Sequence, residues 1–299
     1  MAVVRIYTYN TPISKGKYRL AQVAQRMLVY PHRDLRAAAR DGRPFWIDLS
    51  TGMHDRVYFY GEYELALSEI VRTLIEPGDT CIDAGANFGW YATMFSKLAG
   101  PEGRVVAFEP VSDTFTELQR NVALQGSPSN LTIEPMALGD RSGEIDLYLG
   151  EGQSTGHASF AKPNSKIVSS ARAKLRTLDI YLDENKIEAV DLIKIDVEGA
   201  ELMLLAGANK LFDQKVPPIF MMEVAKEQAA KFGATHNDIL GYLDDHGEFD
   251  HFLVDETRGG ISRIDRFPEE HIGGNIFSMP KATSPRKSRA IETFLAEGA

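Results

Sequence analysis

The sequence predicts an α/β fold in which helices cover both faces of a mostly parallel β-sheet. From Thr80 onward, short apolar runs of strand length alternate with segments of helical periodicity, and this alternation is typical of a parallel sheet. The first run ends in a glycine-containing turn, as the first strand of a doubly wound sheet does. The last two runs have no long helix between them, so we expect the sheet to finish with an antiparallel, hairpin-like pair.

Seven apolar runs supply the expected strands: TCIDAGA, RVVAFEP, LTIEPMAL, DLIKIDVEG, PPIFMMEV, DHFLVDE and GNIFSMP. Between the first two lies WYATMFSKLAG, whose helical spacing stops at Gly100 and Pro101. After the second run, SDTFTELQRNVALQG has Ser112 or Asp113 suited to cap a helix and Gly126 past its end. We therefore expect a helix after each of the first two strands.

The ends of the chain differ from this core. Residues 1–56 are expected to form an accessory segment that covers the substrate or contacts a second copy. Within it, KGKYRLAQVAQRMLVYP predicts an amphipathic helix packed on the main domain, although a membrane-surface helix has the same pattern. We expect the main domain over residues 57–280, opened by a helix in EYELALSEIVRTLIEPGD, and a C-terminal helix over 281–299. That last helix can dock on its own domain or on a second copy, so a homo-oligomer is one expectation.

The charge balance disfavours a nucleic-acid partner. The 299 residues include 33 Lys and Arg against 42 Asp and Glu, for a net charge of -9, whereas phosphate binding needs clustered positive charge. Cys81, the single cysteine, lies in an apolar run and is expected in the core of a protein from a reducing compartment. No run approaches about 18 apolar residues, so we expect no transmembrane helix. The first residues lack a secretory pattern, and we expect a cytoplasmic protein.

The turn after the first strand, CIDAGANFGW, departs from the dinucleotide pattern Gly-x-Gly-x-x-Gly. Asn87 and Trp90 occupy the second and third glycine positions, where their side chains would obstruct a pyrophosphate, and Asp83 would repel it. A nicotinamide-dependent reductase is therefore disfavoured. No Gly-Lys-Ser/Thr follows, which excludes a P-loop. The pattern favours a ligand with a positive centre and no phosphate, and S-adenosylmethionine is such a ligand.

Acidic residues at two strand ends fit that cofactor. Asp83 is placed to hold the ammonium group, directly or through water, while Gly85 and Gly89 let the backbone approach the methionine part. Glu109 follows the glycines by about 20 residues at the tip of the second strand, where an acid accepts both ribose hydroxyls. The end of the third run supplies apolar contact for adenine. The residues expected to bind the cofactor are Asp83, Gly85, Asn87, Gly89, Glu109, Met136 and Ala137.

A second group of charges follows the run DLIKIDVEGAE. Alternation puts Lys194, Asp196 and Glu198 on one side if the strand stays regular to that point. A salt-bridged strand rim is one interpretation of these charges. Their place at a carboxyl end, beside the expected cofactor, favours a catalytic role.

The sequence resembles the FkbM-type S-adenosylmethionine-dependent methyltransferases. The shared motifs are IDAGANFGWY, VVAFEP, KLRTLD and LIKIDVEGAE, with YGEYE and GNIFSMP matching less specifically, so that the resemblance covers about residues 57 to 280. It implies a Rossmann-like class I methyltransferase, with a seven-stranded, mostly parallel sheet whose last strand is antiparallel. It also implies methylation of hydroxyl groups on sugars, polyketides or other small natural products.

The resemblance points to an O-methyltransferase, which needs a base to remove the hydroxyl proton. Asp196 and Glu198 are the leading candidates, followed by Glu223, while Lys194 either orients an acid or forms a salt bridge. His157 lies in a Gly/Ser-rich insertion and is a further catalytic candidate. The three acids would also suit a divalent ion, a secondary hypothesis without a defining spacing. The alternative function is a non-catalytic module that binds the cofactor or a glycan on the same fold.

Overall fold

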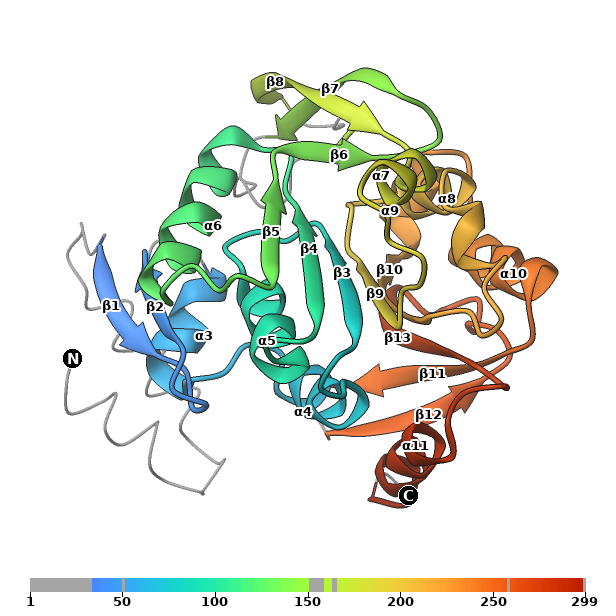
Figure 1. Cartoon of the computed structure of the whole chain (residues 1–299). Helices are drawn as coiled ribbons and strands as arrows, with labels where there is room; N and C mark the ends of the chain where they lie inside the picture. The colour runs from blue at the N-terminus through green and yellow to red at the C-terminus, as the bar shows by residue number, and fades with distance from the viewer. Residues whose placement is uncertain (1–33, 50–51, 151–158, 163–165, 257–258, 298–299) are drawn as a thin grey trace.

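The computed structural model describes residues 34–49, 52–150, 159–162, 166–256 and 259–297 (Figure 1). The helix expected in residues 1–33 lies outside this part. The main sheet has eight strands: β3 (Thr80–Ala84), β4 (Arg104–Phe108), β5 (Leu131–Glu134), β9 (Leu192–Ile195), β10 (Ile219–Ala225), β11 (Phe249–Asp255), β12 (Gly260–Ile264) and β13 (Gly273–Pro280). The helices are α3 (Gly52–Tyr60), α4 (Leu65–Leu74), α5 (Trp90–Ala99), α6 (Ser112–Leu124), α7 (Leu178–Glu184), α8 (Glu201–Ala206), the short 3₁₀ helix η2 (Asn209–Leu211), α9 (Lys226–Ala230), α10 (His236–His246) and α11 (Pro285–Glu297).

The strand order of the main sheet is β12-β11-β13-β10-β9-β3-β4-β5. The five strands from β10 to β5 are parallel, whereas β13 lies between β10 and β11 and pairs antiparallel with both. This confirms the mostly parallel sheet with an antiparallel end. The sheet has eight strands instead of seven because β12 pairs with the outer side of β11. This short strand carries Arg263, and short, charged strands are common at sheet edges.

The third apolar run forms two strands instead of the expected one. β5 ends at Glu134, and β6 (Met136–Leu138) begins after Pro135. β6 leaves the main sheet and pairs with β8 (Ile167–Arg176), which pairs in turn with β7 (Gly143–Gly150). The break falls at a proline, which has no N–H to donate to a strand ladder. The resulting three-stranded sheet lies beyond the carboxyl end of β5, at the top of Figure 1.

Alternate residues of the central strands contribute to two separate cores. On one face, Cys81 of β3 and Met221 of β10 pack with residues of α4 and α5. On the other face, Ile82 and Phe220 pack with residues of α7, α8 and α10. This is the period-two alternation of a strand that is buried on both sides. It leaves the carboxyl edge of the parallel strands as the place where polar side chains gather.

The segments that flank the main sheet share its core. β1 (Leu35–Ala38) and β2 (Pro44–Ile47) form a hairpin, and residues of β2 lie in the same core as α4 and α5. Ile291 of α11 belongs to that core too, and Lys287 Nζ lies 3.0 Å from Asp79 Oδ2 in a buried ion pair. The C-terminal helix therefore docks on its own domain. The expected domain boundary at residue 57 falls within α3.

Asn121 joins two other parts of the fold to the buried side of α6. Its Oδ1 accepts a hydrogen bond from the backbone N of Trp46 at 2.8 Å, and its Nδ2 donates to the backbone O of Phe88 at 2.8 Å. We predict that Asn121→Ala lowers the free energy of unfolding by about 2 kcal/mol, because two buried backbone groups lose their partners. Urea unfolding measures this loss. Gln119→Ala, at an exposed position on the same helix, should change little, and equal losses in the two variants would contradict the assignment.

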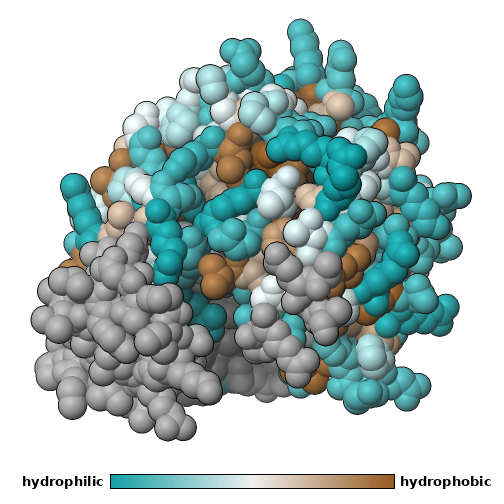
Figure 2. All heavy atoms as spheres, turned by 90° about the horizontal axis from the view of Figure 1, so that it is seen from below, coloured by the Kyte–Doolittle hydropathy of each residue, from teal (hydrophilic) through white to brown (hydrophobic). Residues whose placement is uncertain are grey.

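The lower face of the molecule, opposite the three-stranded sheet, is shown in Figure 2. Hydrophobic side chains occur there in separate small groups among hydrophilic ones, as on an ordinary solvent-facing surface. Within the described ranges, no helix is both long and apolar enough to cross a membrane.

Candidate active site

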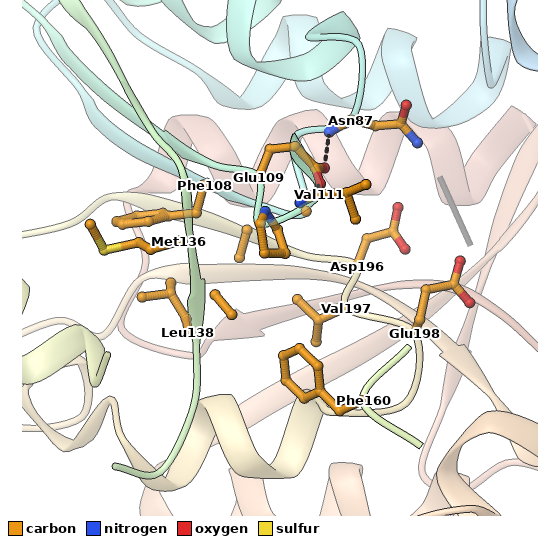
Figure 3. A pocket seen from close by; sticks show the side chains of 14 residues that line it. Asn87, Phe108, Glu109, Val111, Met136, Leu138, Phe160, Asp196, Val197 and Glu198 are labelled. Carbon is orange, nitrogen blue, oxygen red and sulfur yellow. Dashed lines mark hydrogen bonds between the residues drawn. The ribbon is translucent and has the colours of Figure 1, made fainter. Parts of the chain in front are cut away.

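A pocket enclosing about 560 Å³, part of it open to solvent, lies at the carboxyl edge of the main sheet. Its wall comes from the ends of β3, β4 and β9, from β6 and from the segment before β8. The lining residues are Ala84, Gly85, Asn87, Phe108, Glu109, Pro110, Val111, Met136, Ala137, Leu138, Phe160, Asp196, Val197 and Glu198. In Figure 3, apolar side chains occupy one end of the pocket and the carboxylates of Asp196 and Glu198 the other.

Glu109 is fixed at the end of β4 by two backbone donors. Asn87 N donates to its Oε2 and Val111 N to its Oε1, both at 2.9 Å, and the first bond is drawn in Figure 3. Burial raises the pKa of Glu109 to about 7, although these two hydrogen bonds oppose the shift. Each carboxylate oxygen keeps a lone pair for a further donor. Glu109 is thus oriented before any ligand arrives.

The glycine at the end of β3 is required by the neighbouring strand. Gly85 has a φ of +82°, and a Cβ at this position would lie 1.9 Å from the backbone O of Asp196. Gly89 has a φ of +93°, and its Cβ would lie 2.7 Å from Cδ1 of Leu118. We expected both glycines to make room for the cofactor. In the structure they make room for the β9 turn and for α6, which brings Asp196 against the first turn.

Asp83 lies beneath the pocket and is not part of its lining. Its side chain is fully buried, and Oδ1 lies 3.4 Å from Lys194 Nζ. Burial raises the pKa of Asp83 to about 6, and the charge of Lys194 opposes that shift. The expected interaction of Asp83 with an ammonium group, directly or through water, stays a prediction. Asp83 contacts Lys194, which in turn contacts the lining residue Asp196.

Lys194 links the two strand ends that meet at the pocket. Its Nζ donates to the backbone O of Gly85 at 3.1 Å and to Asp196 Oδ2 at 3.2 Å. It also lies 5.6 Å from the ring centroid of Tyr91. Burial disfavours the charged form of Lys194, but the charges of Asp196 and Asp83 outweigh it and raise the pKa above its usual value. The salt-bridge interpretation of this lysine agrees with these contacts.

The alternation expected beyond Lys194 is wrong, because β9 ends at Ile195. Asp196 and Glu198 belong to a turn in which Glu198 has a φ of +55°. Gln228 Nε2 donates to Glu198 Oε2, and Ser159 Oγ donates to the Glu198 backbone O at 2.9 Å. Burial, and then the charge of Asp196, raise the pKa of Glu198 to about 8. The turn after β9, and not the alternation of a regular strand, therefore places both carboxylates at the pocket.

Glu223 and His157 complete the set of expected catalytic residues. Glu223, near the end of β10, is exposed and does not line the pocket. The charge of Asp196 raises its pKa above the usual value. His157 lies outside the described residues. Across the described ranges, no three His, Cys, Asp or Glu side chains are grouped to hold a metal ion, so the divalent-ion hypothesis has no ligand set there.

Phe160 is a lining residue that the sequence analysis missed. It follows Ser159, which is buried and joins the segment to the β9 turn, and in Figure 3 its ring lies beside Val197. Phe160 is the single Phe, Tyr or Trp in the Gly/Ser-rich insertion GEGQSTGHASFAKPNS. An isolated aromatic in a polar insertion is the signal that identifies it. We had given weight only to His157 in this segment.

A profile of the FkbM methyltransferase domain matches residues 83–249, more than half of the chain. The chain belongs to the FkbM methyltransferase family. The match begins at Asp83, the buried acid of β3, and ends at the start of β11. It therefore includes all the lining residues of the pocket. The resemblance drawn from the sequence motifs is confirmed.

Three curated relatives in the comparison are methyltransferases by name. Methyltransferase 1 of Beauveria bassiana is 30% identical over 151 residues, which cover 44% of this chain and 60% of that protein. The 2-O-methyltransferase NoeI of Sinorhizobium fredii is 26% identical over 155 residues, covering 48% and 62%. The hexuronic acid methyltransferase AglP of Haloferax volcanii is 28% identical over 150 residues, covering 46% and 55%. This member of the FkbM family thus spans less than two thirds of the length of each of these relatives.

Proposed function

We propose that the chain is an S-adenosylmethionine-dependent O-methyltransferase that acts on a hydroxyl of a saccharide or another small natural product. One observation carries this proposal: a single pocket joins the carboxylate of Glu109 to those of Asp196 and Glu198. The first carboxylate suits a ribose diol. The other two suit a hydroxyl that must lose its proton.

The lining of the pocket fits the parts of the cofactor. Glu109 would accept hydrogen bonds from the ribose hydroxyls with the lone pairs that its backbone donors leave free. Phe108, Met136 and Leu138 provide apolar surface for the adenine, next to Ala137. The turn from Gly85 through Asn87 to Gly89 would face the methionine part, and Asp83 would favour the ammonium group there by offsetting the positive charge of Lys194. When bound, S-adenosylmethionine supplies the methyl group on a sulfonium, which is a good leaving group.

We assign the base to Glu198 and the orientation of the site to Asp196. During transfer, a bond forms between the acceptor oxygen and the methyl carbon while the bond from carbon to sulfur breaks. The hydroxyl proton moves to the Glu198 carboxylate, so that the products are a methyl ether, a neutral thioether and a protonated acid. A base whose pKa is about 8 is well matched to this task near neutral pH. Asp196 is held by Lys194, and that ion pair would fix the geometry of the turn.

The name of one relative supports O-methylation, and the name of another supports a saccharide acceptor. NoeI is named as a 2-O-methyltransferase and AglP as a hexuronic acid methyltransferase. Glu223 and His157 stay as proposed catalytic residues. The acidic composition of the chain supports a small-molecule acceptor over nucleic acid.

The test is product formation from S-adenosylmethionine and a panel of simple glycosides. Mass spectrometry should detect S-adenosylhomocysteine together with a glycoside that has gained one methylene unit. Heat-denatured protein is the control for spontaneous methylation. A protein that binds S-adenosylhomocysteine but modifies no acceptor would favour the non-catalytic module, and a protein that does not bind it would contradict the cofactor assignment.

A further inference from the structure

Glu64, in the turn between α3 and α4, carries a carboxylate that two distant elements hold. Tyr91 Oη, on α5, donates to Glu64 Oε2 at 2.8 Å. Asn275 Nδ2, on β13, lies 3.5 Å from Glu64 Oε1. Glu64 and Asn275 both lie outside the residues matched by the family profile. Glu64 belongs to YGEYE and Asn275 to GNIFSMP, the two motifs that match the family less specifically than the others.

Glu64 is not used as a cap for its own helix, although it stands at the N-cap position of α4. Its side chain makes no capping hydrogen bond there. Instead, Glu256 accepts from the backbone N of Leu67 at 2.9 Å and of Ala66 at 3.2 Å. Glu64 itself has a φ of +48°, which is a costly conformation for a residue with a Cβ. Glu256, which is distant in the sequence, therefore caps α4. The carboxylate of Glu64 contacts Tyr91 and Asn275 instead.

The carboxylate of Glu64 lies on the side of the pocket that holds Asp196, where the methyl acceptor is proposed to bind. Asn275 is the register partner of Glu223 in the antiparallel ladder between β10 and β13, so their side chains share one face of the sheet. The charge of Asp196, which lines the pocket, acts on both Glu64 and Glu223. Because β13 runs antiparallel, Asn275 near its start lies at the same edge as the carboxyl ends of β9 and β10. Glu64, Asn275 and Glu223 are not among the lining residues of the pocket, and they thus form a separate polar wall beyond Asp196, on the side away from Glu109.

We propose that Glu64 and Asn275 bind a second hydroxyl of the acceptor, next to the one that is methylated, and so select an uncharged or amino-substituted polyol over an anionic one. This inference rests on the proposed function, since it takes the pocket between Glu109 and Glu198 as the cofactor and reaction site. Glu64 would accept a hydrogen bond from the sugar hydroxyl, and the Asn275 amide can donate or accept. A charged acceptor of hydrogen bonds forms stronger bonds to such hydroxyls than a neutral one.

The same wall disfavours an acceptor with a carboxylate or phosphate at this position. Lys194 is already engaged by Asp83, Asp196 and the backbone O of Gly85, and the charge of Lys231 acts on Glu198. An anionic group placed against Glu64 would meet like charges and would lose hydration. A uronic acid, the substrate class in the name of AglP, is therefore the informative comparison.

The test uses saturation-transfer NMR on the full chain saturated with S-adenosylhomocysteine. The probes are methyl α-D-glucopyranoside, methyl α-D-glucosaminide and methyl α-D-glucuronide at equal millimolar concentrations. We expect signals from the neutral and amino glycosides and none from the uronide. Glu64→Gln should weaken neutral-glycoside binding about tenfold while the affinity for S-adenosylhomocysteine stays within about twofold. Asn275→Ala should also weaken the binding of the neutral glycoside.

Glu256→Gln is the matched control, because it perturbs the start of the same helix without belonging to the proposed wall. It should lower the unfolding midpoint and leave glycoside binding unchanged. Binding of the uronide at least as strong as that of the neutral glycoside would overturn the inference, as would absence of binding by both other glycosides. Equal glycoside losses in Glu64→Gln and Glu256→Gln would also overturn it. Failure of S-adenosylhomocysteine to bind would instead count against the proposed function itself.

Discussion

Replacing Glu109 with alanine should weaken the binding of S-adenosylhomocysteine about 100-fold, because two charge-assisted hydrogen bonds to the ribose are lost. The substitution also leaves the backbone N–H groups of Asn87 and Val111 without their acceptor. The turn after β3 would then lose the anchor that fixes it against β4. Calorimetric titration of wild type and variant measures the affinity directly. Glu109→Gln, which retains one acceptor oxygen, should give an intermediate loss.

Glu134→Ala is the matched control for this prediction. Glu134 is an acid at the end of the adjacent strand β5, where its side chain accepts from Tyr181 Oη at 3.0 Å and does not line the pocket. Its replacement should leave the affinity for S-adenosylhomocysteine unchanged. Unchanged binding by a folded Glu109→Ala protein would contradict the ribose assignment. Similar losses in both variants would indicate a general effect on the strand ends and would contradict it as well.

The fold was largely predictable because its signals are local. Seven apolar runs and the helical patterns between them define the parallel sheet, since each strand must be apolar on both faces. Pro135 lies within the third run, but the apolar residues Ile133 and Met136 close to it favoured a single strand. The eighth strand, β12, is short and half polar, so it lacks the apolar run by which the others were found. The hairpin of β7 and β8 was missed for the same reason: most of its side chains are exposed.

The site was predictable where a residue lies at the end of a strand. Glu109, Met136 and Asp196 were selected on that ground, and all three line the pocket. The contacts of Asp83 with Lys194 depend on which way two buried side chains turn, and spacing along the chain does not determine this. Glu64 and Asn275 meet across 211 positions of sequence. Only the insertion of β13 between β10 and β11 brings them together.

Glu198→Gln should lower kcat about 100-fold or more, because the acceptor hydroxyl loses its base. The amide is close in size to the carboxylate and can still accept from Gln228, which now donates to Glu198 Oε2. The turn should therefore persist, and S-adenosylhomocysteine affinity should stay unchanged. The measurement is steady-state methylation of an accepted glycoside, with folding checked by thermal unfolding. A loss of S-adenosylhomocysteine affinity as large as the loss in kcat would mean that the substitution had changed the shape of the pocket and had not simply removed the base.

The pH dependence separates Glu198 from Asp196 as the base. Burial and the charge of Asp196 raise the pKa of Glu198 to about 8, so its active, deprotonated form is scarce below that pH and predominates above it. In the wild type, kcat/KM should rise with pH up to about 8 and then level off. This rise should disappear in Glu198→Gln and persist, at a lower rate, in Asp196→Asn. If the rise persists in Glu198→Gln and disappears in Asp196→Asn, the base is Asp196, and Glu198 only shapes the turn that carries it.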